Sequence, residues 1–467
     1  MQEITLSNGL RVLAVERPGA PTVSFVMQFR VGGVDEPVGS TGIAHVLEHM
    51  LFKGTETIGT MDLRAERQLF AEIDAVQDSI LERSDDGPTS GGERERLEAR
   101  RDSLEDAART AVVPNEYTEI LTRAGAQGLN AMTTNEATIY FVEMPAARAE
   151  LFFALEGDRM ANPVFREFYS ERAVVMEERR MRVDTNPAGA LFERHLATAF
   201  REHPYGQPVV GTMADLQALT RPEVEAYYRR FYGPSNAVLA VVGAIDPEDV
   251  ARWSEEYLGA IPAGDRPPGV STVEPEQREE RRIHLTWEAE PLLRIGWHIP
   301  ASTHPDGPAI ALLASILTGG RTSRLHRRLV TEEGIATSVF ASTGPGSLYA
   351  GLFQIDATPV APATTAQLEA SIYEEIERLA RDGPTEAEIE RIRNQVAAGS
   401  VRRMQSNLGL AFQLAESESL FGDWRETFRV AEDFLHIDAE AVRRVASEYL
   451  TATNRTVATL GREESGR

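Results

Sequence analysis

The two halves of this sequence repeat one another, which restricts the chain to a fold built from two related domains. Val26–Pro37 and Arg294–Pro305 each read as a buried strand, a turn and a proline corner, and they lie 268 positions apart. Phe231–Gly243 and Tyr449–Gly461 form a second matching pair, 218 positions apart. Because both pairs keep the same order along the chain, the sequence predicts two homologous domains.

The difference between the two spacings indicates an insertion of about 50 residues in the first half. Residues 61–113 are rich in Glu, Arg, Ala and Asp, and they carry apolar residues at helical spacing on both sides of a break at Gly87, Pro88, Gly91 and Gly92. The pattern predicts an antiparallel helical hairpin, with a flexible charged linker as the alternative. Such a hairpin could contact a partner chain, cover a substrate chamber or be an inert surface elaboration.

The proline-rich segment after the first half is the best position for a domain boundary. We therefore expect a first domain over residues 1–262, a linker over 263–280 and a second domain over 281–467. Each half mixes strand-like runs with helical runs of 10 to 20 residues. This mixture predicts two α+β domains, each an antiparallel sheet packed with helices, and a hairpin inserted in the first.

Composition excludes several classes of function. The formal net charge is −24, from 48 basic and 72 acidic residues, whereas nucleic acid binding normally needs a basic patch. The absence of cysteine excludes disulfides, thiolate metal sites and a cysteine nucleophile. No apolar run approaches the roughly 18 to 20 residues that span a bilayer. The first residues read as a strand, so we expect an export signal to be absent or already removed.

A short histidine-rich motif predicts a metal site. His45 and His49 are four residues apart in TGIAHVLEHMLFKGT, a run with helical apolar spacing, so both imidazoles project from one helix face. Glu48 flanks the same face, and the order H-x-x-E-H is a metallopeptidase signature. The alternative is an ordinary helix whose histidines are bonded to backbone carbonyls.

A hydrolytic zinc site needs a third protein ligand, and a second helical segment offers carboxylates. In Tyr169–Asp184, Glu171 and Glu178 are seven residues apart and therefore lie on one helix face, two turns from each other. Glu177 points about 100° away from Glu178. Two carboxylates on one face could supply a ligand and a supporting partner. An ordinary charged helix is the alternative.

Motifs along nearly the whole chain resemble a known family, the inverzincin metallopeptidases of the pitrilysin, insulysin and mitochondrial processing peptidase group, and in particular its half-length bacterial members. The motifs are NGLRVLAVE, GGVDEP, TGIAHVLEHMLFKGT, LNAMTTNEATIYF, ERAVVMEE, HPYGQPVVGT, FYGPSNAVLAVVG and LTGGRTSRLHRRLVTEEGIATSV. The resemblance implies two α+β halves that face each other, the second without a metal site.

The resemblance also implies roles for individual residues. His45 and His49 match the two histidine ligands of the family and Glu48 matches its general base. Glu178 matches the third ligand, and Glu171 matches the upstream glutamate that supports the site. One Zn²⁺ per chain is implied, although Co²⁺ or Mn²⁺ could occupy the same ligands.

Family members bind peptides or unfolded segments as an extra strand on a sheet edge, a mode that takes affinity mainly from backbone hydrogen bonds. The matching segment here is Asn130, Ala131, Met132 and Thr133, which could also be an ordinary strand. The resemblance thus implies a zinc-dependent endopeptidase, either of broad specificity or dedicated to processing presequences or propeptides. A zinc-bearing but inactive scaffold subunit is the alternative.

The second half departs from the family pattern in one respect. Family members often carry an arginine and, 13 residues later, a tyrosine, which bind substrate and help to stabilise the oxyanion. Arg324 fits the arginine, but Thr337 occupies the tyrosine position. We therefore hypothesise a heterodimer whose zinc-less partner supplies the pair. The alternative is a homodimer that uses Arg324 alone or with Tyr349. Half-length bacterial relatives are often exported, which favours the periplasm over the cytoplasm.

Overall fold

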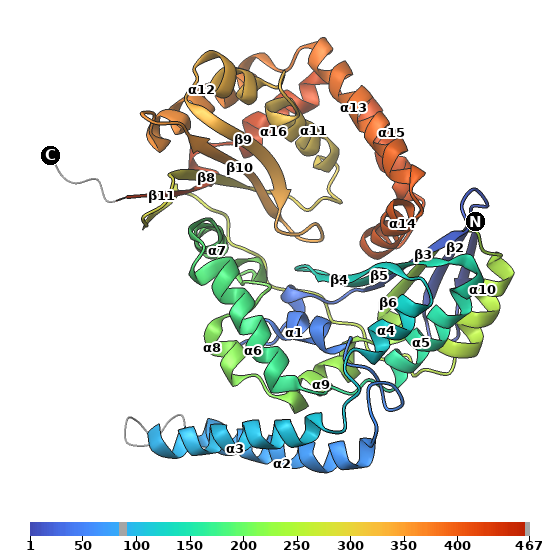
Figure 1. Ribbon diagram of the computed structural model, residues 1–467. Helices are drawn as coiled ribbons and strands as arrows, with labels where there is room; N and C mark the ends of the chain where they lie inside the picture. The colour runs from blue at the N-terminus through green and yellow to red at the C-terminus, as the bar shows by residue number, and fades with distance from the viewer. Residues whose placement is uncertain (84–90, 463–467) are drawn as a thin grey trace. The chain divides into compact units, whose positions relative to one another are not determined.

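A computed structural model of the chain describes residues 1–83 and 91–462 (Figure 1). By their contacts these residues form two compact units, and the chain passes between them more than once. Unit 1 comprises residues 1–178, 209–269 and 407–415. Among the described residues, unit 2 comprises 179–208, 270–406 and 416–462. The units differ from the linear division expected above at two places, because residues 179–208 pack in unit 2 and residues 407–415 in unit 1.

Unit 1 is built on a six-stranded sheet in the order β1-β2-β6-β3-β5-β4. The strands are β1 Gln2–Thr5, β2 Arg11–Glu16, β3 Thr22–Phe29, β4 Gln127–Thr133, β5 Thr138–Pro145 and β6 Ala237–Gly243. Its helices are α1 Ile43–Met50, α2 Leu63–Glu82, α3 Gly91–Arg109, α4 Glu116–Arg123, α5 Ala149–Ala161, α6 Phe168–Arg179, α8 Met213–Ala218, α9 Arg221–Phe231 and α10 Pro247–Trp253. The central strand β6 is buried along its whole length, as its sequence AVLAVVG requires.

Unit 2 is built on a five-stranded sheet in the order β7-β11-β8-β10-β9. The strands are β7 Arg281–Thr286, β8 Leu292–Ile299, β9 Ala336–Gly344, β10 Gly351–Pro359 and β11 Arg455–Gly461. Its helices are α7 Pro187–Ala199, α11 Gly307–Thr318, α12 Thr365–Asp382, α13 Glu386–Gln405, α15 Glu426–His436 and α16 Ala439–Tyr449, while α14 Asn407–Phe421 begins in unit 1. The α+β class is confirmed. Each sheet is antiparallel except for one parallel pair, β2 with β6 and β7 with β11.

The register of the strands confirms that the two halves are homologous. In unit 1, Phe29 of β3 pairs with Ala237 of β6. In unit 2, Trp297 of β8 pairs with Arg455 of β11. Trp297 lies 268 positions after Phe29 and Arg455 lies 218 positions after Ala237, so the two pairs are equivalent. The same displacement relates two side-chain amides. Asn236 donates to the carbonyls of Arg30 and Phe231, and Asn454 donates to those of His298 and Tyr449.

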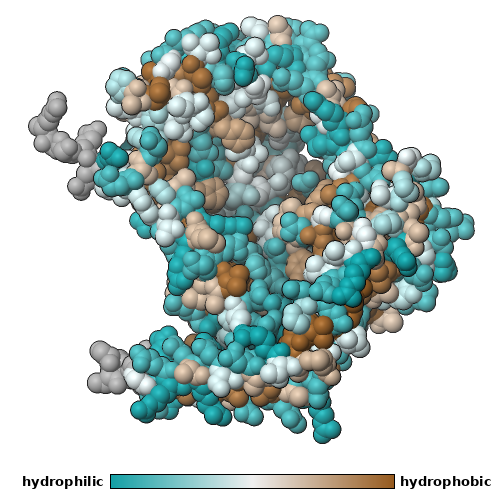
Figure 2. Space-filling model, in the orientation of Figure 1, coloured by the Kyte–Doolittle hydropathy of each residue, from teal (hydrophilic) through white to brown (hydrophobic). Residues whose placement is uncertain are grey.

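The inserted segment forms the predicted helical hairpin, in which α2 and α3 lie side by side (Figure 1). Its two ends meet, since the amide of Met61 donates to the carbonyl of Ala111 over 2.7 Å. Of the predicted turn residues, Gly87 and Pro88 lie outside the described residues. Much of the visible hairpin surface is hydrophilic (Figure 2). Within residues 1–83 and 91–462, no helix combines the length and apolar content needed to cross a bilayer.

Candidate metal centre

Helix α1 carries the histidine motif and is held at its first turn by a side chain from the preceding loop. Gly42 begins the helix with φ of 89°, and an added Cβ would meet the carbonyl of Val210 at 2.8 Å, so glycine is required there. The carboxylate of Glu36 accepts from the amides of Gly42 at 2.8 Å and Ala44 at 3.0 Å. These are amides that the helix itself cannot satisfy.

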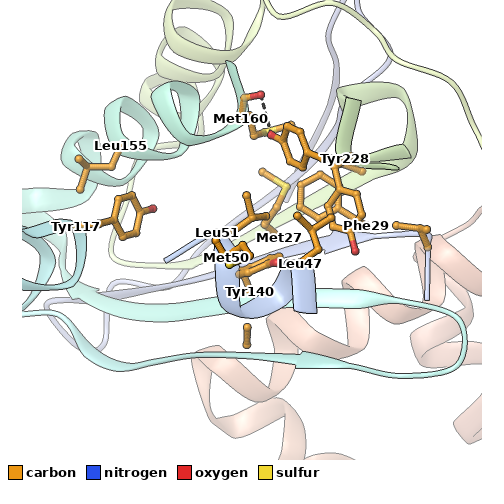
Figure 3. Close-up of a cluster of buried hydrophobic side chains, with 14 of the residues drawn as sticks. Met27, Phe29, Leu47, Met50, Leu51, Tyr117, Tyr140, Leu155, Met160 and Tyr228 are labelled. Carbon is orange, nitrogen blue, oxygen red and sulfur yellow. Dashed lines mark hydrogen bonds between the residues drawn. The ribbon is translucent and has the colours of Figure 1, made fainter. Parts of the chain in front are cut away.

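One side of α1 packs into the core, and this fixes the direction of its polar side chains. Val46, Leu47 and Met50 are fully buried, and Leu47 and Met50 belong to the apolar cluster drawn in Figure 3, with Tyr140 of β5 beside them. The core contacts set the rotation of the helix about its axis. His45 and His49 consequently share the other side, with ring centroids 5.1 Å apart.

Helix α6 brings two carboxylates to this pair of imidazoles. The Oε2 atom of Glu178 lies 3.6 Å from Nε2 of His45 and 3.5 Å from Nε2 of His49. Glu171, two turns earlier, lies 3.5 Å from Nδ1 of His49. Both glutamates therefore lie on the helix face that the sequence predicted, whereas Glu177 is exposed.

The donor atoms fit a zinc ion. His45, His49 and Glu178 each offer one ligand atom, all within 4.8 Å of one another. An ion with tetrahedral bonds of about 2.0–2.1 Å holds its donors about 3.3 Å apart, close to the separations found here. Two imidazoles and one carboxylate are also the ligand set of hydrolytic zinc sites, which keep a fourth position for water.

Lys53 completes the polar surroundings of the site. Its ammonium lies 2.5 Å from Oε1 of Glu171 and 3.1 Å from Oε2 of Glu167. Burial raises the pKa of Glu171, but bonds from His49 and Lys53 outweigh it and bring the pKa down to about 2. Burial lowers the pKa of His49, yet the carboxylates around it, Glu171 foremost, leave it above its ordinary value. Glu171 is thus held as an anion that fixes the ring of His49.

Glu48, next to His49 on α1, contacts the edge of the sheet. The hydroxyl of Thr133, at the end of β4, donates to Oε2 of Glu48 over 2.5 Å. Strand β4 forms the edge of the sheet and pairs with β5, Ala131 opposite Tyr140 and Met132 opposite Ile139. The structure therefore brings the predicted base and the predicted substrate strand Asn130–Thr133 together.

The remaining predicted residues lie in unit 2. The guanidinium of Arg324 is buried, donating twice to Glu388 at 2.7 Å and once to the carbonyl of Gly383 at 3.1 Å. Thr337 donates to the carbonyl of Thr358, and the hydroxyl of Tyr349 accepts from a backbone amide. These surroundings are structural, so a substrate-binding role for Arg324 stays a prediction without support from its contacts.

Unit 2 offers no equivalent metal site within the residues described. Helix α11 follows β8 as α1 follows β3, but its sequence GPAIALLASILT contains no histidine or carboxylate. All five of its leucine and isoleucine side chains are buried in the core of the unit: Ile310, Leu312, Leu313, Ile316 and Leu317. Over the described part of the chain, His45, His49 and Glu178 are the one cluster suited to a metal.

Sequence reasoning missed the residues that support the site. Lys53 lies near the end of the quoted histidine motif and Glu36 is the glutamate of GGVDEP, but neither had been given a role. Lys53 pairs with Glu171, 118 positions later, and this contact depends on how α6 packs against α1. Glu36 accepts from amides at most eight positions later. Acidic residues shortly before a helix start were the available signal for Glu36.

Comparison with known proteins identifies the family. The sequence model of the insulinase family, peptidase family M16, matches residues 11–73 and 108–213. The model of the M16 inactive domain matches residues 218–396. The chain belongs to the insulinase family of peptidases. Residues 74–107 lie outside both matches, whereas the start of α2 and the end of α3 lie within the match of the insulinase family model.

Several proteins named zinc proteases are similar along most of their length. The zinc protease PqqE of Helicobacter pylori is 27% identical over 97% of this chain and 91% of its own. An uncharacterised zinc protease of Mycobacterium leprae is 28% identical over 96% and 88%. The crystal structure of a protease from Helicobacter pylori has a TM-score of 0.80 at 24% identity, covering 98% of each chain. A structure described as a peptidase M16 inactive domain, from Pseudomonas fluorescens, has a TM-score of 0.78 at 16% identity, covering 100% of this chain and 99% of that one. The last two similarities concern the fold.

Proposed function

We propose that this chain is a zinc-dependent endopeptidase that hydrolyses peptides or unfolded segments. The observation that carries the proposal is the cluster of His45, His49 and Glu178, with Glu48 beside it and bonded to an edge strand. A zinc ion held by the cluster would supply Lewis acidity that eases deprotonation of a water molecule and polarises the scissile carbonyl.

The chain's own residues would supply the proton transfer and hold the substrate. Glu48 would accept the proton of the attacking water and pass it to the leaving amine. Thr133 steadies that carboxylate through its hydroxyl. A substrate added as a strand along β4 would run past Thr133 and so past Glu48, with affinity taken from backbone hydrogen bonds. Broad sequence tolerance is expected from such binding.

The test is cleavage of an internally quenched peptide library by the purified chain. Glu48→Gln should keep zinc and lose activity by about 10²- to 10⁴-fold, the range that general base catalysis supplies. Glu177→Gln, an exposed glutamate of α6, is the matched control and should leave activity near that of the unmodified chain. Chelation should abolish cleavage and added Zn²⁺ should restore it. Cleavage that persists in Glu48→Gln would sink the proposal.

The contacts of Arg324 and Thr337 favour a second candidate, in which the zinc-bearing chain acts with a partner. Arg324 is held by Glu388, and Thr337 lacks the reach of a tyrosine. A zinc-less partner could supply the pair of an arginine and a tyrosine, and a homodimer is the other arrangement. Zinc bound without hydrolysis would point to the partner. If hydrolysis were still absent with the partner present, the inactive scaffold would be the better description. Export to the periplasm stays a prediction.

A further inference from the structure

The base of the hairpin contacts α6, which carries Glu178, and reaches the loop after α1 through Arg166. We use "hairpin base" for Glu66 of α2 with Glu105 and Arg109 of α3. The helices enter the core of unit 1 at this end, where Phe70, Ile73 and Ala108 are at most 6% exposed. Because these apolar side chains are packed in the core, the position of the hairpin base relative to α6 is fixed.

Glu105 caps the helix that holds the third ligand. Its side chain is nearly buried, and its carboxylate accepts from the amide of Tyr169 and from the hydroxyl of Ser170, each at 3.1 Å. Tyr169 is the second residue of α6, so its amide has no partner within the helix. A carboxylate placed there fixes the start and the direction of a helix. Glu171 follows immediately.

Arg109 begins a chain of ion pairs that ends at a metal ligand. Its guanidinium lies 3.2 Å from Glu167, which lies 3.1 Å from the ammonium of Lys53. Lys53 in turn pairs with Glu171, and Glu171 with His49. Each contact limits where the next side chain can lie. The position of α3 therefore affects the orientation of the His49 imidazole.

Glu66 acts on the loop that follows α1. Its carboxylate receives Nε of Arg166 at 2.9 Å, and both side chains are 0% exposed. The other nitrogens of Arg166 donate to the carbonyls of Lys53, Thr55 and Ile58. One buried guanidinium thus ties α2 to the turn that ends the histidine helix.

A fully buried ion pair is a poor means of stabilisation, because desolvation of both charges offsets most of their attraction. Such a pair is better explained by the geometry that it enforces. We propose that the hairpin positions the metal centre, because Glu105 and Arg109 hold α6 in place and Glu66, through Arg166, holds the turn after α1. These three are positioning residues, and the inference rests on the proposed zinc site.

The test compares metal binding by full-length variants. Glu105→Ala and Arg109→Met should each weaken zinc affinity by about tenfold, the lower end of the cost of losing a partner behind a metal ligand. Both should alter the visible absorption of the Co²⁺-substituted chain and lower kcat with little change in KM. Arg109→Lys should recover part of the loss. Affinity is measured by competition with a chelator, and thermal unfolding is recorded for each metal-free variant.

Glu95→Ala, at an exposed position on the same helix, is the matched control. If both variants have the zinc affinity and the Co²⁺ absorption spectrum of this control, the positioning role of the hairpin is excluded, whatever their thermal stability. The side chain of Arg109 is 42% exposed, so Arg109→Met is less disruptive to folding and decides the matter should Glu105→Ala fail to fold. If the unmodified chain binds zinc but cleaves no peptide, the proposed function is overturned. The comparison of zinc affinities still tests the positioning role of the hairpin in that case.

Discussion

Glu36 should set the orientation of the histidine helix, because its carboxylate is the partner of two amides in the first turn of α1. Glu36→Ala leaves both amides without that acceptor and should cost about 1–3 kcal/mol of stability. Burial raises the pKa of this carboxyl well above its ordinary value, so Glu36→Gln, which keeps an uncharged acceptor, should cost less. Chemical denaturation measures both. Val38→Ala, 98% exposed in the same loop, should be neutral.

Glu171 should make the metal-free protein lose stability in acid. Its pKa is about 2 in the folded chain against an ordinary 4.5, so its contribution is present above pH 4.5 and is lost as pH falls towards 2. Glu171→Gln should cost on the order of 2 kcal/mol at pH 6, after allowance for solvent screening, and little near pH 2.5. Denaturation curves at both values measure this. An equal cost at the two values, or the same pattern in Glu177→Gln, would contradict the assignment.

At the scale of single residues, the sequence predicted what depends on helical spacing. His45 and His49 share a face because they are four apart, and Glu171 and Glu178 because they are seven apart. That the two faces meet depends on how α1 and α6 pack, and it was expected only from the family resemblance. The pairing of Lys53 with Glu171 depends on the same packing and was not predicted.

At the scale of elements, the hairpin was predictable because its two apolar stripes have helical spacing and the change in repeat spacing gives the length of the insertion. Its contacts with α6 were not, since Glu105 and Arg109 look like any charged residues of an exposed helix. The parallel pairs β2 with β6 and β7 with β11 were also missed, because parallel pairing joins strands that are distant in the chain.

The outer part of the hairpin should be dispensable if only its base acts on the metal centre. Gln77 of α2 receives a hydrogen bond from Arg101 of α3 at 3.2 Å, so the two helices can be rejoined just beyond this pair. Replacing residues 80–98 by a short Gly-Ser turn should leave zinc affinity within about twofold of that of the full chain, because distant and independent sites couple weakly. Loss of zinc binding in a folded, shortened chain would show that the tip is needed.

At the scale of the whole molecule, the duplication was predictable because matching segments recur at two spacings, 268 and 218 positions, whose difference gives the length of the insertion. The two spacings reproduce the strand register of both sheets. The exchange of residues 179–208 and 407–415 between the units was not readable, because membership of a unit is decided by tertiary contacts. Helix α7, for example, follows α6 along the chain but packs on β11.

Arg324 is the residue through which the second unit can be tested, because a structural role and a substrate-binding role predict different results. Its guanidinium is buried against Glu388, whose pKa is brought down to about 2 mainly by this contact against the effect of burial. Removing one partner of a buried pair leaves the other uncompensated, so Arg324→Ala should cost about 3 kcal/mol of stability. Arg321→Ala, an exposed neighbour, should cost little. Peptide cleavage assayed below the unfolding temperature should keep its KM in both variants. A KM that rises in Arg324→Ala without loss of stability would instead return Arg324 to the substrate site, and would mean that unit 2 takes part in binding despite lacking a metal cluster among its described residues.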